Sequence, residues 1–343
     1  MSLFNSSTSA LNVAQVHRSR IKGKNVLITG VATGNMGEAT ALAFAHGGAS
    51  TIIITARDQA KLHVVTHSLS ESYPNTKFRP LLLNLSSLKA VREAANEIIA
   101  DAAIPQLDYL IANAGVNSFD APRTETDDGI EMHFGVNHLA HHLLVQLLLP
   151  KIKAAASTTP PGETRIVLVS SAACFGSPVR FSDWNYKRSS NDVPDSEKPN
   201  WGPLASFIGR PQEPDYFEAN IAYAQAKTAN ILTAIQLNKI LSAEGIYAFS
   251  LDPGYVDSNG AKTQIPKMSE ASRKALGEPK TTDQGAATVL VAAASPELKP
   301  EDGFYLVDCV VDMEKCPPFA SDQVAAEKLW ALSDMALKAR AIL

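Results

Sequence analysis

One stretch near the start of the chain constrains its fold more than any other. Residues 25–29 form a short apolar run, a glycine-rich turn follows, and residues 38–46 have helical spacing. Glycines let the backbone approach a ligand closely, and the amino end of a helix offers unpaired N–H groups to phosphate. This stretch therefore predicts a dinucleotide site, with candidate residues Gly30, Thr33, Gly34, Asn35, Met36 and Gly37.

Short apolar runs alternate with helical patterns over most of the chain. Further runs lie at residues 51–55, 78–83, 107–112, 164–170, 246–251 and 304–307. This alternation predicts parallel strands joined by helices that cover both faces of a sheet. We expect an α/β fold with one Rossmann-like doubly wound parallel sheet. We expect this fold to form a single domain over residues 21–343, and residues 1–20 to form a loose N-terminal arm.

The residue just beyond the second strand bears on the choice of dinucleotide. An acidic residue there binds a ribose 2′-hydroxyl, whereas an arginine accommodates a 2′-phosphate. Arg57 occupies this place, and Asp58 is expected to cap the next helix. The pattern favours NADP(H) over NAD(H), and the alternative is a solvated arginine at a helix start.

Polar residues follow later strands, where a ligand crevice is expected. Asn113, Ala114 and Gly115 form a turn after the strand at 107–112, and Ser171 follows the strand at 164–170. Asn137 precedes an apolar helix at 139–149, so its amide needs a hydrogen-bond partner in a buried polar network.

Tyr223 and Lys227 stand four residues apart in a long helical pattern at 217–241. Side chains at this spacing leave the same face of a helix. A nearby ammonium group favours phenolate, so we expect Lys227 to lower the pKa of Tyr223 from about 10. Such a phenol exchanges a proton with a carbonyl or alcohol oxygen.

Two long segments lack periodicity. Residues 174–216 are an insertion, either a substrate-side lid or a surface elaboration that packs on itself. Its candidate apolar lining is Trp184, Trp201, Phe207, Tyr216 and the adjacent Phe217. Residues 259–280 are expected to be a flexible loop. A final helix is expected at 321–341, with Ser321 as its N-cap.

Composition excludes several classes of function. The net charge is −4 without a basic block, which argues against nucleic acid as the main partner. No secretory leader or membrane-length apolar run is visible, and three cysteines without metal spacing suggest a reducing compartment, so we expect a cytoplasmic protein. His138 and His142 share helical spacing, but no further ligand joins them, and we expect no metal.

Taken together, these motifs resemble the short-chain dehydrogenase/reductase family. The resemblance extends from about Lys24 to Val307. It rests on Thr29 with the glycine turn, Asn113–Gly115, Asn137, Ser171, Tyr223 with Lys227, and Pro253 with Gly254, in the family's order. Residues 129–144 and 222–232 look most like the retinol-dehydrogenase-like and WW-domain-oxidoreductase-like branch, which is common in fungal metabolism, including secondary metabolism.

The resemblance implies roles for these residues. Tyr223 would be the acid/base, Lys227 would hold the nicotinamide ribose, Ser171 would bind the substrate carbonyl, and Asn137 would hold a water that links Lys227 to solvent. The remaining cofactor contacts that it implies are Asn84, Leu85, Asn113, Ala114, Gly115, Pro253, Gly254, Val256 and Ser258. Family members are often homo-oligomers that assemble through the tyrosine-bearing helix and its neighbour.

The chain departs from the family's pattern in several places. The interval between Gly34 and Gly37 is one residue longer than usual, and Asn84 and Ser258 replace an aspartate and a threonine. The leading hypothesis is an NADP(H)-dependent reductase or dehydrogenase of a fairly large apolar ketone, aldehyde or alcohol. The alternatives are an NADP(H)-binding regulatory protein without turnover, and a non-redox lyase or isomerase that retained the tyrosine.

Overall fold

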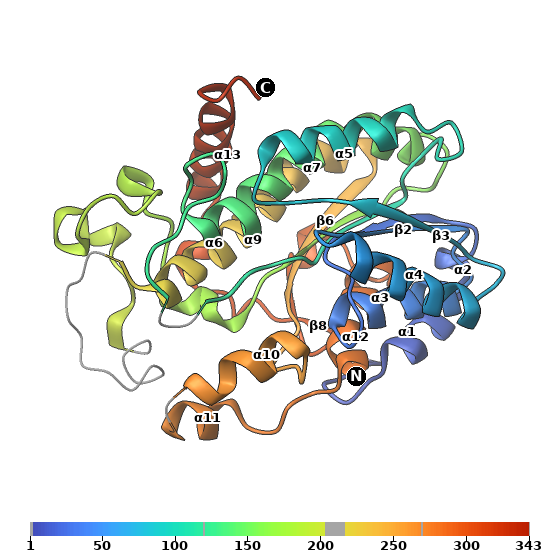
Figure 1. The fold of residues 1–343 in the computed structure, drawn as a ribbon, viewed down its shortest axis with the longest axis horizontal. Coiled ribbons are helices and arrows are strands. Elements are labelled where there is room, and N and C mark those ends of the chain that lie inside the picture. Colours follow the sequence, from blue (N-terminus) through green and yellow to red (C-terminus); the bar gives the residue numbers. More distant parts are fainter. Residues whose placement is uncertain (1–2, 119–120, 203–216, 269, 343) are drawn as a thin grey trace.

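A computed structural model describes residues 3–118, 121–202, 217–268 and 270–342 (Figure 1). Its centre is one sheet of eight strands in the order β3-β2-β1-β4-β5-β6-β7-β8. The strands are β1 (Asn25–Ile28), β2 (Thr51–Ala56), β3 (Lys77–Leu82), β4 (Tyr109–Ala112), β5 (Thr164–Val169), β6 (Ile246–Asp252), β7 (Tyr305–Val307) and β8 (Val310–Val311).

All neighbouring strands are parallel except β7 and β8, which are antiparallel. The predicted doubly wound parallel sheet is therefore confirmed, with β8 as an added short edge strand. Because strands β1 to β7 are parallel, their carboxyl ends meet along one edge of the sheet. Candidate residues that follow different strands are gathered there.

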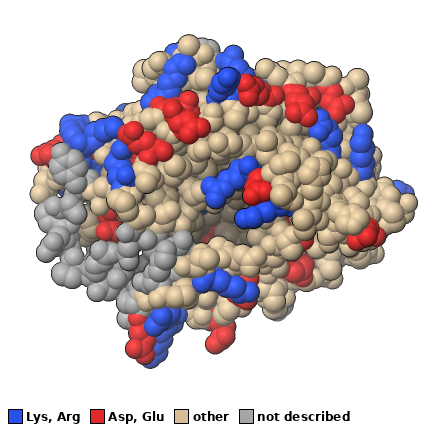
Figure 2. Space-filling model, viewed as in Figure 1, with Lys and Arg blue, Asp and Glu red and all other residues tan. Residues whose placement is uncertain are grey.

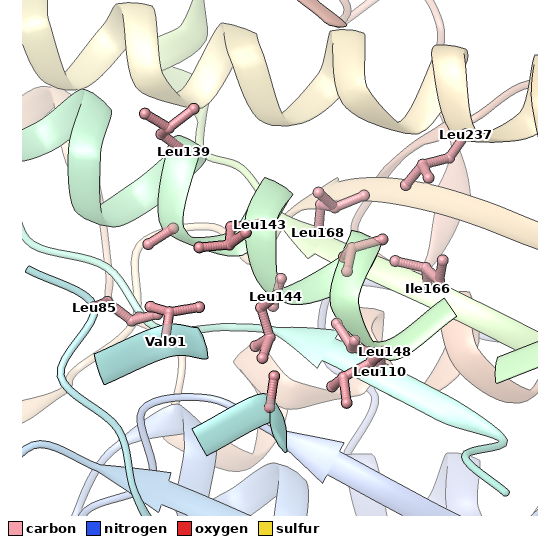
Figure 3. Close-up of a cluster of buried hydrophobic side chains, with 14 of the residues drawn as sticks. Leu85, Val91, Leu110, Leu139, Leu143, Leu144, Leu148, Ile166, Leu168 and Leu237 are labelled. Carbon is pink, nitrogen blue, oxygen red and sulfur yellow. The ribbon is translucent and has the colours of Figure 1, made fainter. Parts of the chain in front are cut away.

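Helices cover both faces of the sheet (Figure 1). One face packs against α5 (Leu88–Ala100), α7 (Ala140–Ala156), α9 (Ala219–Leu241) and α13 (Gln323–Lys338); the other packs against α1 (Ala10–Val16), α3 (Met36–His46), α4 (Gln59–Ser72) and α12 (Thr282–Ala294). Successive residues of one strand serve opposite cores: Leu27 belongs to the first cluster, and Val26 and Ile28 to the second. Figure 3 shows Leu139, Leu143, Leu144 and Leu148 packed over the strands of the first face.

The amino-terminal segment is not a loose arm. After α1, a second short helix, α2, spans Arg18–Ile21, and α1 packs against α3 and α12. Val13 and Ala14 are fully buried, and the Asp283 carboxylate of α12 accepts hydrogen bonds from the N–H groups of Ala10 and Leu11. The expectation failed because this segment's partner lies more than 270 residues away in sequence.

The segment at 259–280 is also more regular than expected. It contains α10 (Asn259–Gln264) and α11 (Glu270–Leu276), and Ser258 caps α10 by accepting a hydrogen bond from Ala261 N–H (3.2 Å). The Asn259 amide donates to the Thr33 carbonyl (2.9 Å), so α10 begins against the glycine-rich turn. Short polar helices such as these carry little apolar periodicity, which is why the sequence pattern suggested a loop.

The final helix begins later than expected, and its cap supports a stability prediction. Asp322, rather than Ser321, accepts hydrogen bonds from Val324 N–H (2.7 Å) and Ala325 N–H (3.2 Å). We expect Asp322→Ala to lower the free energy of unfolding by about 1 kcal/mol, because two N–H groups lose their acceptor. Urea denaturation measures the change. Ser321→Ala is the matched control, and an equal loss in both variants would contradict the assignment.

Candidate active site

The tyrosine and lysine of α9 lie at the carboxyl edge of the sheet. Lys227 is buried, and its ammonium group donates a hydrogen bond to the Val169 carbonyl at the end of β5 (2.8 Å). The same ammonium lies 5.5 Å from the centre of the Tyr223 ring. The spacing of four residues therefore places both groups on one face of α9, next to the end of β5.

Ser171 completes this group from the turn after β5. Its side chain lies beside the Tyr223 hydroxyl and lowers the pKa of that phenol. It also caps a short 3-10 helix, Ala172–Gly176, by accepting a hydrogen bond from Ala173 N–H (3.2 Å). The helical cap fixes the serine in place at the end of β5.

Asn137 lies in a π-helical turn, Gly135–Leu139, between α6 (Met132–Phe134) and α7. Its buried amide bonds the Val116 backbone in both directions, accepting from Val116 N–H (2.7 Å) and donating to the Val116 carbonyl (3.0 Å). The expected buried polar network is confirmed. A π-helical turn inside a helix is frequent at functional sites.

The expected lowering of the Tyr223 pKa is wrong. Burial raises the pKa of Tyr223 to about 12; the hydrogen bond from Ser171 lowers it, and the Asp252 carboxylate raises it. Burial also lowers the pKa of Lys227 to about 8, while Asp252 raises it. The desolvation of the phenol therefore outweighs any effect of the neighbouring ammonium.

The glycine-rich turn accommodates its additional residue by capping α3. Gly30 and Gly34 have φ of +74° and +75°, values that favour glycine. Asn35 is the N-cap and accepts from Glu38 N–H (3.0 Å), while Glu38 accepts from Gly34 N–H (2.7 Å). A β-carbon at Gly37 would lie 2.5 Å from the Gly30 carbonyl oxygen, so the helix start packs directly on the turn.

The turn after β4 lies between the glycine-rich turn and the tyrosine group. Asn113 donates to the Thr29 carbonyl (2.8 Å), and a β-carbon at Gly30 would lie 2.8 Å from Ala114. A β-carbon added at Gly115 would lie 3.5 Å from Lys227 Nζ. The Asn113 amide oxygen is buried and has no partner among the described residues. An unsatisfied acceptor beside a glycine cradle fits a hydroxyl-bearing dinucleotide.

The exposed side chain of Arg57 follows β2, and the amide side chain of Asn84 follows β3. Arg57 is exposed, and Asp58 caps α4 as expected, accepting from Lys61 N–H (3.0 Å). The Asn84 oxygen already accepts two hydrogen bonds from Ser86 (2.8 and 3.1 Å), so a bond with adenine would have to replace one of them. The Leu85 side chain belongs to the hydrophobic core (Figure 3).

The turn after β6 closes the other side of the site. Gly254 follows Pro253 with φ of +80°, and Val256 is buried beside Gly285 and pairs with Lys280. Figure 2 shows a hollow in this face of the molecule, bordered by basic side chains. Seen in the same orientation as Figure 1, the hollow lies between α9, α10 and the sheet.

The described part of the insertion packs on itself and on α9. Arg180 is fully buried, where it pairs with Asp183 (2.7 Å) and lies over the Tyr186 ring. Trp184 packs against Phe134, and its carbonyl accepts from Gln225 of α9. Trp201 and Phe217 pack against a small cluster around Tyr186. Phe207 and Tyr216 lie outside the described residues.

Sequence reasoning missed two acidic residues near the site. Asp252 is the buried last residue of β6, and Glu131 is fully buried beside His133, whose ring contacts Tyr223 edge-on at 6.1 Å. An acidic residue at the end of a buried strand was the available signal for Asp252. Nothing in the spacing of Glu131 and His133 indicates that the histidine ring meets Tyr223.

His138 and His142 bind α13 rather than each other. Their Nε2 atoms lie 2.8 Å from Ser333 Oγ and 2.9 Å from Asp334 Oδ1. Across the described ranges, no group of three or more His, Cys, Asp or Glu side chains is arranged to hold a metal ion. Within the same ranges, no helix combines the length and hydropathy needed to cross a bilayer.

Comparison with known proteins agrees with this geometry. A family model described as short chain dehydrogenase matches residues 24–183. Oxidoreductase fscI of Fusarium equiseti is 37% identical over 252 residues, which cover 74% of this chain and 95% of that protein. Retinol dehydrogenase 14 of Mus musculus is 33% identical over 326 residues, which cover 91% of this chain and 85% of that protein.

Among solved structures, a protein of unassigned function from Mycobacterium paratuberculosis is 27% identical, with a TM-score of 0.63. The match covers 93% of this chain and 94% of that protein. The motifs, the sheet and the extent of these similarities lead to one classification. The chain belongs to the short-chain dehydrogenase/reductase family of oxidoreductases, in its retinol-dehydrogenase-like, fungal-type branch.

Proposed function

We propose that this protein is an NADP(H)-dependent oxidoreductase that interconverts a ketone or aldehyde and an alcohol on a fairly large apolar molecule. One observation carries the proposal. The Tyr223 hydroxyl lies beside the Ser171 side chain, and the Lys227 ammonium lies 5.5 Å from the centre of the Tyr223 ring, at the same sheet edge as the glycine-rich turn. Residues for proton transfer and for dinucleotide binding therefore share one site.

The proposed mechanism assigns one task to each side chain. Ser171 donates a hydrogen bond to the substrate carbonyl and stabilises the developing oxyanion. Tyr223 donates the proton to that oxygen, and Lys227 holds a ribose hydroxyl beside it. Asn137 keeps the Val116 backbone in place next to Lys227 and holds a water for proton relay. NADPH, when bound, supplies the hydride.

Arg57 supports NADP(H) as the cofactor. Its side chain is exposed at the end of β2, and Asp58, the nearest carboxylate in sequence, is occupied as the cap of α4. An arginine in this place accommodates a 2′-phosphate. The glycine turn and Asn113 would hold the pyrophosphate and adenosine ribose, and Pro253, Gly254, Val256 and Ser258 would flank the nicotinamide.

An apolar substrate is supported by two observations. Phe175, four residues after Ser171, is 38% exposed, although a side chain of this kind is usually buried. The mouse relative is a retinol dehydrogenase, named for a largely apolar alcohol. We therefore expect a carbonyl or alcohol carried on an apolar body. The test is a panel of such compounds with NADPH, in which both product and cofactor oxidation are measured.

The pH dependence follows from Lys227. Its pKa of about 8 means that the ammonium is present below pH 8 and is lost above it, whereas the Tyr223 phenol stays protonated to about pH 12. We expect kcat/KM for carbonyl reduction to be flat from pH 6 to about 8 and then to fall about tenfold per pH unit. In Lys227→Arg, the kcat/KM that remains should not fall in this way above pH 8. A flat profile to pH 10 in the wild type would contradict the prediction.

Two alternatives give different results in the same panel. A non-redox lyase or isomerase forms product while NADPH absorbance stays constant. An NADP(H)-binding regulatory protein binds the cofactor but turns over no compound, and it is indifferent to Tyr223→Phe. The geometry of Ser171 and Tyr223 favours the redox enzyme because it provides both carbonyl activation and a proton donor.

We also propose a cytoplasmic location. All three cysteines are free and buried, which suits a reducing compartment.

The contacts of His138 and His142 with α13 cover part of the α7–α9 surface. A homo-oligomer would therefore need a different or rearranged surface, which analytical ultracentrifugation can test.

A further inference from the structure

His141 is a buried histidine of α7 that the proposed mechanism does not use. Its Nε2 lies 2.9 Å from Thr29 Oγ1, and its Nδ1 lies 3.1 Å from the Asn137 carbonyl oxygen. Thr29 follows β1 and leads into the glycine-rich turn, whereas Asn137 lies in the π-helical turn before α7. The two nitrogens of one ring therefore join the dinucleotide side of the site to the proton-transfer side.

The partners of the ring determine which nitrogen carries the proton. Burial lowers the pKa of His141 to about 4, so at neutral pH the imidazole has one donor and one acceptor. The Asn137 carbonyl can only accept, so Nδ1 donates to it and Nε2 accepts the proton of the Thr29 hydroxyl. A second oxygen near that hydroxyl, the Ile111 carbonyl (3.4 Å), already accepts from Thr29 N–H and Asn113 N–H (both 3.0 Å).

The Thr29 hydroxyl holds the first half of the turn after β4. It accepts hydrogen bonds from Asn113 N–H (3.0 Å) and Ala114 N–H (2.9 Å). A hydroxyl has one proton and two lone pairs, so donation to His141 leaves both lone pairs for these N–H groups. The ring nitrogen therefore sets the orientation of the hydroxyl that fixes the proposed ribose contacts.

Asn137 holds the second half of the same turn. Its side chain accepts from Val116 N–H (2.7 Å) and donates to the Val116 carbonyl (3.0 Å). A β-carbon added at Gly115 would lie 3.3 Å from Asn137 Oδ1 and 3.5 Å from Lys227 Nζ, so this half of the turn lies against the lysine. His141 binds the backbone carbonyl of Asn137 and thereby fixes the point from which its side chain reaches the turn.

We propose that His141 is a positioning residue for this reaction: its two ring nitrogens hold the Thr29 hydroxyl and the Asn137 backbone, and through them both halves of the turn at 113–116. The inference rests on the proposed function, in which this turn contacts the ribose on one side and Lys227 on the other. An apolar side chain would fill the same buried position at a lower desolvation cost. The two hydrogen bonds are what histidine adds there.

Two substitutions separate the two hydrogen bonds. An asparagine amide lies near the place of Nδ1, and a glutamine amide reaches the place of Nε2. In His141→Asn the Thr29 hydroxyl loses its acceptor, so the Kd for NADPH should rise about tenfold while kcat at saturating NADPH stays within about twofold. In His141→Gln the Asn137 carbonyl loses its donor, so kcat should fall about tenfold while Kd stays within about twofold.

His142→Gln is the matched control. His142 is the next residue of α7 and is also buried, but its Nε2 binds Asp334 of α13 (2.9 Å) and not the site. The Kd for NADPH and kcat should both stay at the wild-type values. A purely structural role of His141 would change Kd and kcat together in both of its variants, and that result would overturn the inference.

The tautomer of His141 provides a test that needs neither turnover nor a folded variant. In ¹⁵N NMR spectra of the wild type at neutral pH, assigned through the backbone, Nδ1 should carry the proton and Nε2 should carry none. A proton on Nε2 would overturn the inference. If the tautomer is as expected and His141→Asn weakens NADPH binding, but the wild type reduces no carbonyl, the proposed function fails and the role of His141 on the cofactor side stands.

Discussion

Tyr223→Phe is expected to lower kcat for carbonyl reduction by about 10²- to 10⁴-fold, the range typical of a lost general acid. The substitution removes only the hydroxyl beside Ser171, and the ring keeps its edge-on contact with His133. The dissociation constant for NADPH should stay within about twofold, because the change does not remove Lys227. Steady-state kinetics and cofactor fluorescence measure the two quantities.

Two control variants sharpen this prediction. Ser171→Ala should also reduce kcat strongly, since it removes the second hydroxyl at the reacting oxygen. Tyr186→Phe, in the insertion, removes a buried phenol hydroxyl that takes no part in the proposed mechanism, so kcat should hardly change. Full activity of Tyr223→Phe would mean that another group donates the proton, and the assignment of the site would fail.

Arg57→Ala is expected to weaken NADPH binding by about 10- to 150-fold and to leave NADH binding nearly unchanged. Hydrogen bonds to a charged group contribute about 1.5–3 kcal/mol, which corresponds to that range of dissociation constants. Arg57 has an exposed side chain, so its removal should not affect folding. Isothermal titration with both cofactors measures the preference.

The matched control for Arg57 is Lys338→Ala, which removes one exposed positive charge from the end of α13. If NADPH binding weakens equally in both variants, the effect is one of overall charge and not of a 2′-phosphate contact. If the wild type prefers NADH, the NADP(H) assignment is wrong, although the dinucleotide site remains.

Much of the site was predictable because of the parallel sheet. Apolar runs marked strands β1 to β7, and the carboxyl ends of parallel strands meet at one edge. Asn113, Ser171 and Tyr223 are far apart in sequence, yet they had to come close once the strands were placed. Asp58 was also recognised as a helix cap, because capping is a local interaction.

Other features depend on contacts that sequence spacing does not reveal. The docking of α1 depends on Asp283, and the place of α13 depends on the buried His138 and His142. The pKa of Tyr223 was misjudged because spacing shows the nearby lysine but not the burial of the phenol or the charge of Asp252. Electrostatic predictions therefore require the three-dimensional surroundings of each group.

The central claim is that this site transfers a hydride between NADP(H) and a carbonyl carbon, with Tyr223 as the proton donor. The most direct test uses NADPH deuterated at both C4 positions, incubated with a carbonyl compound that the panel identifies, and mass spectrometry of the product. The account predicts an alcohol with one deuterium at the former carbonyl carbon, formed in equal amount to NADP⁺, and almost none with Tyr223→Phe. Product without deuterium, formed while NADPH stays intact, would contradict it.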